Sequence, residues 1–211
     1  MDKRLTGAAV AVVAATLAVS ACSSSRSSAP FTPGVSATAQ NASAYGSVNM
    51  PPFGKNAHVI MTGWLPQDAS QAGAVVTDKN YELAYLYAEY RGGHDQSWTS
   101  YASQGMAVGI KKALSARDVT TESFQGTIRI FGMRVIQDPI VTADWDVSAC
   151  FDNAQSVNTN LTTGAVLPGQ SPSDSSYYRY TDELAPTSSG QWQVVSSYPS
   201  VYYPQAKECK P

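Results

Sequence analysis

The sequence predicts an α+β fold in which helices come first and an antiparallel sheet follows. Between residues 77 and 116, apolar side chains recur at the spacing of amphipathic helices. After Ser123 the chain changes to β-branched and aromatic runs separated by turn residues, which is typical of a meander of antiparallel strands. Helices that precede such a sheet are expected to cover one of its faces.

Two helices are predicted. The first has an apolar face with side chains at positions i, i+3, i+4 and i+7, namely Tyr81, Ala84, Tyr85 and Ala88. Thr77 or Asp78 can cap its N-terminus, and the glycines at 92–93 are expected to end it. The second helix is predicted from Ser103, as its N-cap, to about Ala116.

The second half contains five predicted strands, at residues 127–137, 141–152, 156–166, 177–182 and 191–198. Alternation along the second of these places four apolar side chains on one face: Trp145, Val147, Ala149 and Phe151. That face should meet the helices. Asp144 and Asp146 lie on the other face and are expected to be solvated carboxylates; the alternative is a paired acid and base.

The N-terminal region has the features of an export signal, with Lys3 and Arg4, an apolar run over residues 5–19 and small residues before Cys22. Residues 19–22, Val-Ser-Ala-Cys, resemble the bacterial lipobox, whose cysteine receives a diacylglycerol and becomes the first residue of the mature protein. We therefore expect a lipoprotein signal peptide over 1–21, and a lipid anchor at Cys22 on the extracytoplasmic face of the cell membrane. An ordinary secretory signal and an uncleaved anchor are the alternatives, although an apolar run of about 15 residues is short for a membrane span.

Residues 22–56 are rich in Ser, Ala, Pro, Gly and Asn and contain two charged residues, Arg26 and Lys55. Such a segment has too few apolar side chains to order itself, so we expect a disordered tether with a reach of about 30 Å. The remaining residues, 57–211, are expected to form a single α+β domain.

The sequence contains three cysteines. If Cys22 carries lipid, Cys150 and Cys209 remain, and an exported protein is in a compartment where disulfides persist. We expect these two to pair, closing a loop of about 60 residues that would contribute about 4 kcal/mol to stability. Two free thiols are the alternative.

Composition argues against several classes of function. Charged residues make up 14% of the chain, the net charge is −2, and no basic run is present, so nucleic acid is not an expected partner. His58 and His94 lie outside any metal-ligand spacing, and neither a phosphate-binding glycine motif nor a G-x-S-x-G elbow occurs. We therefore expect no metal and no cofactor.

Aromatic side chains are the most suggestive candidates for a site. Five of them could lie between the first helix and the sheet: Tyr81, Tyr85, Trp145, Phe151 and Trp192. They could simply fill that space as core, or they could line a pocket for a small apolar or amphipathic ligand.

Two short motifs resemble a known group. Residues 147–153, VSACFDN, are followed by residues 190–194, GQWQV, and then by Cys209. This pattern is similar to a group of secreted proteins and lipoproteins from high-GC Gram-positive bacteria, which look like members of the nuclear transport factor 2-like superfamily. The resemblance covers roughly residues 77–209. It implies a cone-shaped fold of helices against a curved antiparallel sheet, and a disulfide between Cys150 and Cys209, but it implies no reaction.

Catalytic branches of that superfamily, which resemble ketosteroid isomerases and polyketide cyclases, place an acid or base with Tyr or His inside the cone. The inward positions recognised in this sequence are Trp, Val, Ala, Phe and Tyr. We therefore expect a non-catalytic binding or interaction module of the cell envelope, with a small apolar ligand or an envelope protein as partner. A small-molecule enzyme is the alternative, and an inward Asp, Glu or His beside a Tyr in a pocket of about 300 Å³ or more would favour it.

Overall fold

A computed structural model describes residues 44–49, 53–116 and 121–211. The predicted signal peptide, Cys22 and most of the predicted tether lie outside the described residues. Within them, no helix is both long enough and apolar enough to cross a membrane.

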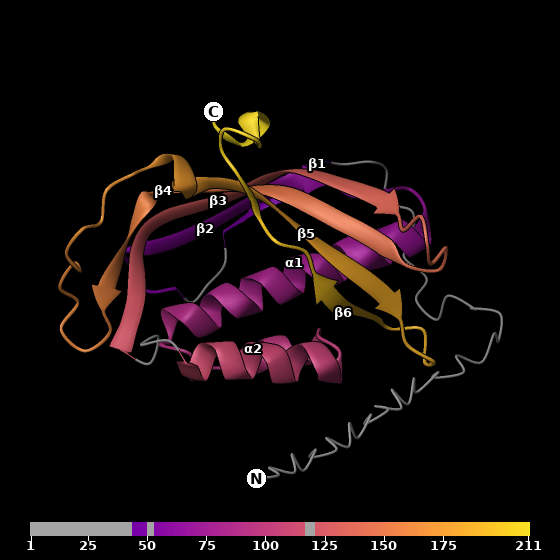
Figure 1. The fold of residues 1–211 in the computed structure, drawn as a ribbon, viewed down its shortest axis with the longest axis horizontal. Helices are drawn as coiled ribbons and strands as arrows, with labels where there is room; N and C mark the ends of the chain where they lie inside the picture. The colour runs from indigo at the N-terminus through magenta and orange to yellow at the C-terminus, as the bar shows by residue number, and fades with distance from the viewer. Residues whose placement is uncertain (1–43, 50–52, 117–120) are drawn as a thin grey trace, which may run out of the picture. The chain divides into compact units, whose positions relative to one another are not determined.

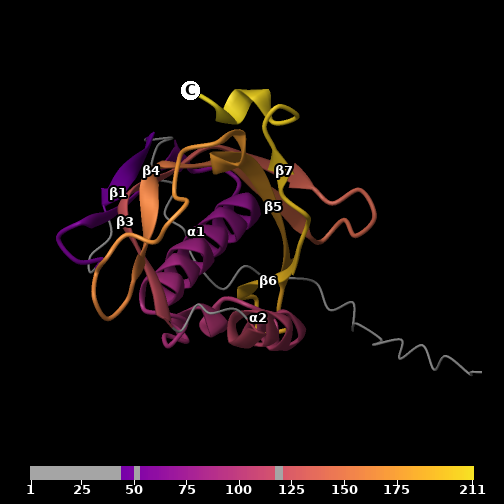
Figure 2. The same cartoon turned by 60° about the vertical axis from the view of Figure 1, so that its left-hand side comes forward.

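The described residues form seven strands in one sheet together with two α-helices. The strands are β1 (Ala44–Asn49), β2 (Ala57–Trp64), β3 (Glu122–Gln137), β4 (Trp145–Asn160), β5 (Tyr177–Pro186), β6 (Trp192–Ser197) and β7 (Val201–Tyr202). The helices are α1 (Ala69–Tyr90) and α2 (Gln104–Ala116), and short 3-10 turns occur at Ser97–Ser100, Asp174–Ser176 and Lys207–Cys209. The sheet curves over α1, and α2 lies on the other side of α1 from it, near β6 (Figures 1 and 2). The predicted α+β fold, with helices packed on a curved sheet, is confirmed.

The sheet has the order β1-β2-β3-β4-β5-β6, and β7 pairs with β5. All pairs are antiparallel except β2 and β3, which run parallel because α1 and α2 lie between them in the chain. The sequence prediction placed no strand before the helices, so both β2 and its parallel pairing were missed. Strand β1 lies within the range predicted as a tether and pairs with β2.

Helix α1 begins earlier than predicted. Its N-cap is Asp68, whose side chain accepts a hydrogen bond from the backbone N–H of Gln71 at 2.9 Å, so Asp78 lies in the middle of the helix. The predicted end is confirmed: the helix stops at Tyr90, and Gly92 and Gly93 adopt φ of 66° and 77°, which favour glycine.

The predicted bounds of α2 are also confirmed. Ser103 Oγ accepts a hydrogen bond from the backbone N–H of Met106 at 3.3 Å, and the helix ends at Ala116. The backbone N–H of Ser103 also donates to the carbonyl of Val194 in β6 at 2.8 Å. This bond holds the start of α2 against the last long strand.

The two faces of β4 are both covered. Val147, Ala149 and Phe151 are buried in the main core with α1, as the alternation predicted. On the other face, Cys150 is buried beside Ala206, and its disulfide to Cys209 joins Cα atoms 5.0 Å apart. The predicted disulfide is therefore confirmed.

The expectation of a solvated Asp144 is wrong, because its exposed fraction is 1%. Asp144 belongs to the turn before β4, where its N–H donates to the carbonyl of Val141 and its carbonyl accepts from the N–H of Asp138. Strand alternation does not extend into that turn. Asp146 is half-buried, and burial and the neighbouring Asp138 and Asp144 raise the pKa of its carboxyl.

Candidate functional site

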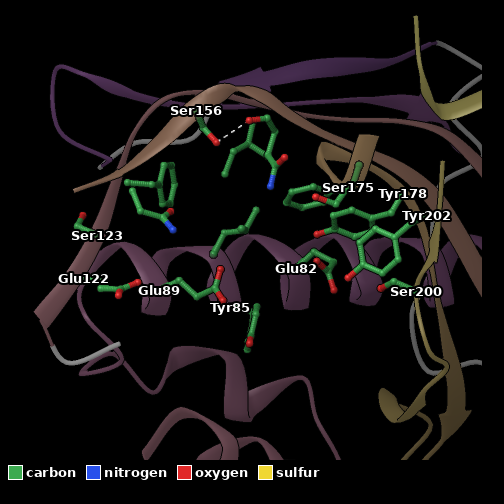
Figure 3. Close-up of a pocket in the computed structure, with 16 residues that line it drawn as sticks. Glu82, Tyr85, Glu89, Glu122, Ser123, Ser156, Ser175, Tyr178, Ser200 and Tyr202 are labelled. Atoms are coloured by element: carbon green, nitrogen blue, oxygen red, sulfur yellow. Dashed lines mark hydrogen bonds between the residues drawn. The ribbon is translucent and has the colours of Figure 1, made fainter. Parts of the chain in front are cut away.

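A cavity of about 530 Å³ lies between α1 and the sheet, and we call it the α1–sheet cavity (Figure 3). Its lining comes from α1, β3, β4, β5 and β7 and from the loops beside them. Pockets for small molecules commonly have volumes of about 300 to 1,000 Å³. The space between helix and sheet is therefore not fully packed.

One face of α1 supplies the floor of this cavity. Glu82, Tyr85, Leu86 and Glu89 all line it, and their spacing of three, four and seven residues places them on one side of the helix. Glu122, at the start of β3, is a third acidic residue of the lining. None of the described residues that line the cavity is Lys, Arg or His.

The opposite wall is aromatic. Tyr178 of β5 stacks on Phe151 of β4 with ring centroids 4.7 Å apart, and it contacts Tyr202 of β7 with centroids 5.3 Å apart. All three rings line the cavity, and the figure shows Tyr178 and Tyr202 beside Glu82 (Figure 3). Six small polar side chains complete the lining, namely Ser123, Asn153, Ser156, Asn158, Ser175 and Ser200.

Behind Glu82 is a cluster of three carboxyl groups, formed by Asp78 and Glu82 of α1 and Asp182 of β5. The exposed fractions of Asp78 and Asp182 are 0% and 2%. Glu82 is half-buried and lines the cavity. The carboxyl groups of Asp78 and Glu82 both lie close enough to that of Asp182 to share a proton with it. We call these three residues the carboxyl cluster.

Hydroxyl groups of the sheet complete the carboxyl cluster. Tyr180 donates its phenol O–H to Asp78 Oδ2 at 3.2 Å, and Ser197 donates its O–H to Asp182 Oδ1 at 2.5 Å. The remaining oxygens, Asp78 Oδ1 and Asp182 Oδ2, are buried and have no donor if every carboxyl is ionised. A proton held between two carboxyl groups satisfies both sides, so the geometry itself favours a partly protonated cluster.

The direction of each pKa agrees with this picture. Burial, and then the charge of Asp182, raise the pKa values of Asp78 and Glu82 well above the ordinary range. Burial also raises the pKa of Asp182, but the hydrogen bonds that it receives from Ser197, Asp78 and Glu82 oppose that shift. The hydrogen bonds to Asp182 therefore favour ionisation there, whereas burial and the charge of Asp182 disfavour it at Asp78 and Glu82.

The aromatic residues singled out from the sequence do not all come together in the cavity. Tyr85 and Phe151 line it. Tyr81 is buried behind the lining and stacks on Tyr85 with centroids 6.2 Å apart. Trp145 donates its indole N–H to Ser70 Oγ at 2.8 Å, and Trp192 is part of the core; neither is among the lining residues.

Sequence reasoning missed the acidic half of the site. A signal was present, because Glu82 and Glu89 interrupt the same helix face as Tyr85, and Asp182 shares strand parity with Tyr180 and Leu184. A carboxyl group at an inward position of both elements predicts a buried cluster if the two faces meet. We did not make that connection from the sequence.

A second cavity of about 590 Å³ lies near the C-terminal end of α1, and Ser123 and Phe124 line both cavities. Its lining includes Lys55, Arg91 and His94, all of them exposed. We favour the α1–sheet cavity as the site because buried polar groups converge there. Among the described residues, His, Cys, Asp and Glu form no group of three or more that could hold a metal ion.

Comparison with known proteins gives little further information. No protein-family model and no curated protein matches the chain. Among solved structures, a ketosteroid isomerase-like protein from Erwinia carotovora atroseptica SCRI1043 is 15% identical, with a TM-score of 0.42 over 63% of this chain and 95% of that one. A "putative aromatic ring hydroxylase" from Novosphingobium aromaticivorans DSM is 10% identical, with a TM-score of 0.38 over 61% and 92%. We draw no conclusion about activity from either similarity.

Proposed function

We propose that the protein is an extracytoplasmic lipoprotein, anchored to the membrane through Cys22, whose domain binds a small molecule in the α1–sheet cavity. The observation that carries the binding function is the cavity itself, where carboxyl and tyrosine side chains meet beside an unfilled space of about 530 Å³. A domain that served only as a structural spacer would have no need of buried ionisable groups next to such a space, because burying them costs free energy.

The anchor is supported by sequence alone, through the lipobox-like residues 19–22. A tether that begins at Cys22 would hold the domain off the bilayer instead of against it. The chemistry of the lining changes our expectation of the ligand. Three acidic side chains and six small polar ones accompany the aromatic rings, so a purely apolar ligand is a poor match.

The binding function is tested by titrating the protein with three related probes, phenethylamine, 2-phenylethanol and 3-phenylpropionate, in isothermal titration calorimetry. Ser200 lines the cavity, so Ser200→Trp should fill it and abolish binding. Ser188 lies in the exposed turn between β5 and β6, and Ser188→Trp is the matched control. We expect saturable binding of at least one probe to wild type and to Ser188→Trp. If no probe binds, or if binding survives Ser200→Trp, the proposal is wrong.

A second candidate is a small-molecule enzyme of the ketosteroid isomerase or polyketide cyclase-like type, and one observation favours it. Glu82 lies beside Tyr178 in a cavity larger than about 300 Å³, and its raised pKa suits an acid that delivers a proton. The test is exchange of the α-hydrogens of 2-tetralone in deuterated water, followed by NMR. An enzyme should accelerate exchange above the buffer rate, and Glu82→Gln should remove the acceleration. Exchange at the buffer rate would contradict the enzyme candidate, and the binding function would remain.

A further inference from the structure

We propose that the α1–sheet cavity takes an organic cation, an amine whose ammonium group pairs with the carboxylate of Glu82, and that binding releases a proton from the carboxyl cluster. This inference rests on the proposed binding function and specifies its ligand. The proton that leaves is the one on the Glu82 carboxyl; it passes to solvent through the cavity, and the ammonium takes its place as the positive partner of that group.

The charges around the cavity select the ligand by sign. Glu82, Glu89 and Glu122 line it, and no lining residue in the described part of the chain carries positive charge. An anionic ligand would have to be buried beside Glu82 and the carboxyl cluster, which is costly. A cation gains from the same arrangement.

The aromatic wall suits the rest of such a ligand. Tyr178 lies between Phe151 and Tyr202, and all three residues line the cavity. Ammonium groups are attracted to aromatic faces by about 0.5 to 2 kcal/mol, and an aryl or alkyl chain can pack on the same rings. Carboxylate on one side and tyrosine on the other is therefore a fitting environment for an amine.

The buried oxygens of the carboxyl cluster provide a second, independent indication. Asp78 Oδ1 and Asp182 Oδ2 are completely buried and find no donor outside the cluster. A positive group placed at Glu82 would lie at the open end of this cluster and offset its negative charge. A cation bound at Glu82 would therefore stabilise the cluster. Without a ligand, protons offset the negative charge of the carboxyl groups instead.

The protonation of Glu82 depends on everything that faces it. The titratable groups around it are Asp78, Tyr81, Tyr85 and Glu89 on α1, Tyr178, Tyr180 and Asp182 on β5, and Tyr202 on β7. All are acidic or neutral, and burial, then Asp182 and Glu89, raise the pKa of Glu82. An ammonium ion reverses that balance because it stabilises the ionised form. The affinity for an amine should therefore increase with pH until Glu82 is ionised in the free protein, and decrease again when the amine itself loses its proton.

The test is calorimetric titration of the full-length protein with phenethylamine, its neutral analogue 2-phenylethanol and its anionic analogue 3-phenylpropionate. Titrations in phosphate and in Tris, which have different ionisation enthalpies, measure proton release directly. We expect phenethylamine to bind at least about tenfold more tightly than the alcohol, with up to one proton released per amine, and no binding of the anion in this cavity. Binding that survives Ser200→Trp would lie outside this cavity and would contradict the binding function on which the inference rests.

Two variants make the outcome specific to Glu82. Glu82→Gln should weaken phenethylamine binding at least about tenfold, remove the buffer dependence and leave 2-phenylethanol unaffected. Glu183→Gln removes a carboxyl that does not line the cavity and should change nothing. Circular dichroism confirms that both variants fold. If the alcohol or the anion binds as well as the amine, if Glu82→Gln keeps the amine affinity, or if no proton is released, this inference is wrong and the binding function stands. If no probe binds at all, the binding function itself fails.

Discussion

Tyr180 of β5 donates a hydrogen bond to Asp78 of α1, joining two buried residues that are 102 positions apart in the sequence. This contact ties the middle of the long helix to the sheet beside the cavity. Tyr180→Phe removes the donor and leaves Asp78 Oδ2 buried without a partner. We expect the free energy of unfolding to decrease by about 1 to 3 kcal/mol. Urea denaturation measures it, with the exposed Tyr198→Phe as a control that should change little. An unchanged unfolding midpoint in Tyr180→Phe would show that the bond contributes nothing.

Stability should depend on pH through the carboxyl cluster. Burial raises the pKa values of Asp78 and Glu82 above those of the unfolded chain, so the folded state holds more protons than the unfolded state. The stability that these two groups contribute is fully present below their unfolded pKa of about 4. It is lost as the pH rises through their pKa values in the folded protein. Asp78→Asn keeps the shape and cannot ionise, so its stability should decrease less with rising pH. The measurement is a series of urea unfolding curves between acidic and alkaline pH, with the exposed Asp174→Asn as control. Identical pH slopes in wild type and Asp78→Asn would contradict the assignment.

The contact between α1 and β6 depends on a glycine. A Cβ atom at Gly73 would lie 2.6 Å from Trp192 Nε1, whereas one at Gly109 of α2 would meet no atom within 4 Å. Both are helix positions, where alanine is normally favoured over glycine by about 0.5 to 1 kcal/mol. Gly109→Ala should therefore raise the thermal unfolding temperature, and Gly73→Ala should lower it. Two shifts in the same direction would show that Trp192 does not constrain this part of the helix.

The disulfide between Cys150 and Cys209 should stabilise the C-terminal segment, where Arg179 also pairs with Glu208. Replacing both cysteines by serine opens a loop of 59 residues and should lower stability by about 2 to 4 kcal/mol. Wild-type protein with reduced cysteines should behave like the double variant in urea unfolding. Free thiols in the untreated protein, detected by alkylation at these two positions, would contradict the bond.

Lipid attachment is tested at Cys22. Intact mass of the membrane-extracted protein should show cleavage before Cys22 and the added mass of two or three acyl chains, since a single chain binds membranes only marginally. Cys22→Ala should remove that mass and prevent processing at this site. Cell fractionation should then show a changed distribution. A wild-type protein without lipid mass would rule out the anchor.

Local patterns in the sequence were sufficient for several features. The glycines at 92–93 and the cap at Ser103 predicted where α1 ends and α2 begins, because turn conformation and capping depend on a few neighbouring residues. The α+β order followed from periodicity, and the cysteine count together with the export signal predicted the disulfide. Strand alternation in β4 correctly predicted which side chains enter the core.

Long-range contacts decided the candidate site. The sequence prediction began α1 near Asp78, where a carboxyl group serves as an exposed cap, whereas the true cap at Asp68 places Asp78 in the buried middle of the helix. From there it meets Asp182, far along the chain. Burial raises the pKa of both carboxyl groups, and the charge of Asp182 raises that of Asp78 further. Neither burial nor charge coupling is a property of a local segment, because both arise only when α1 and β5 pack together. The sequence by itself determined the end of α1, the bounds of α2 and the inward face of β4, and the tertiary structure decided which acids share a site and that a cavity opens beside them.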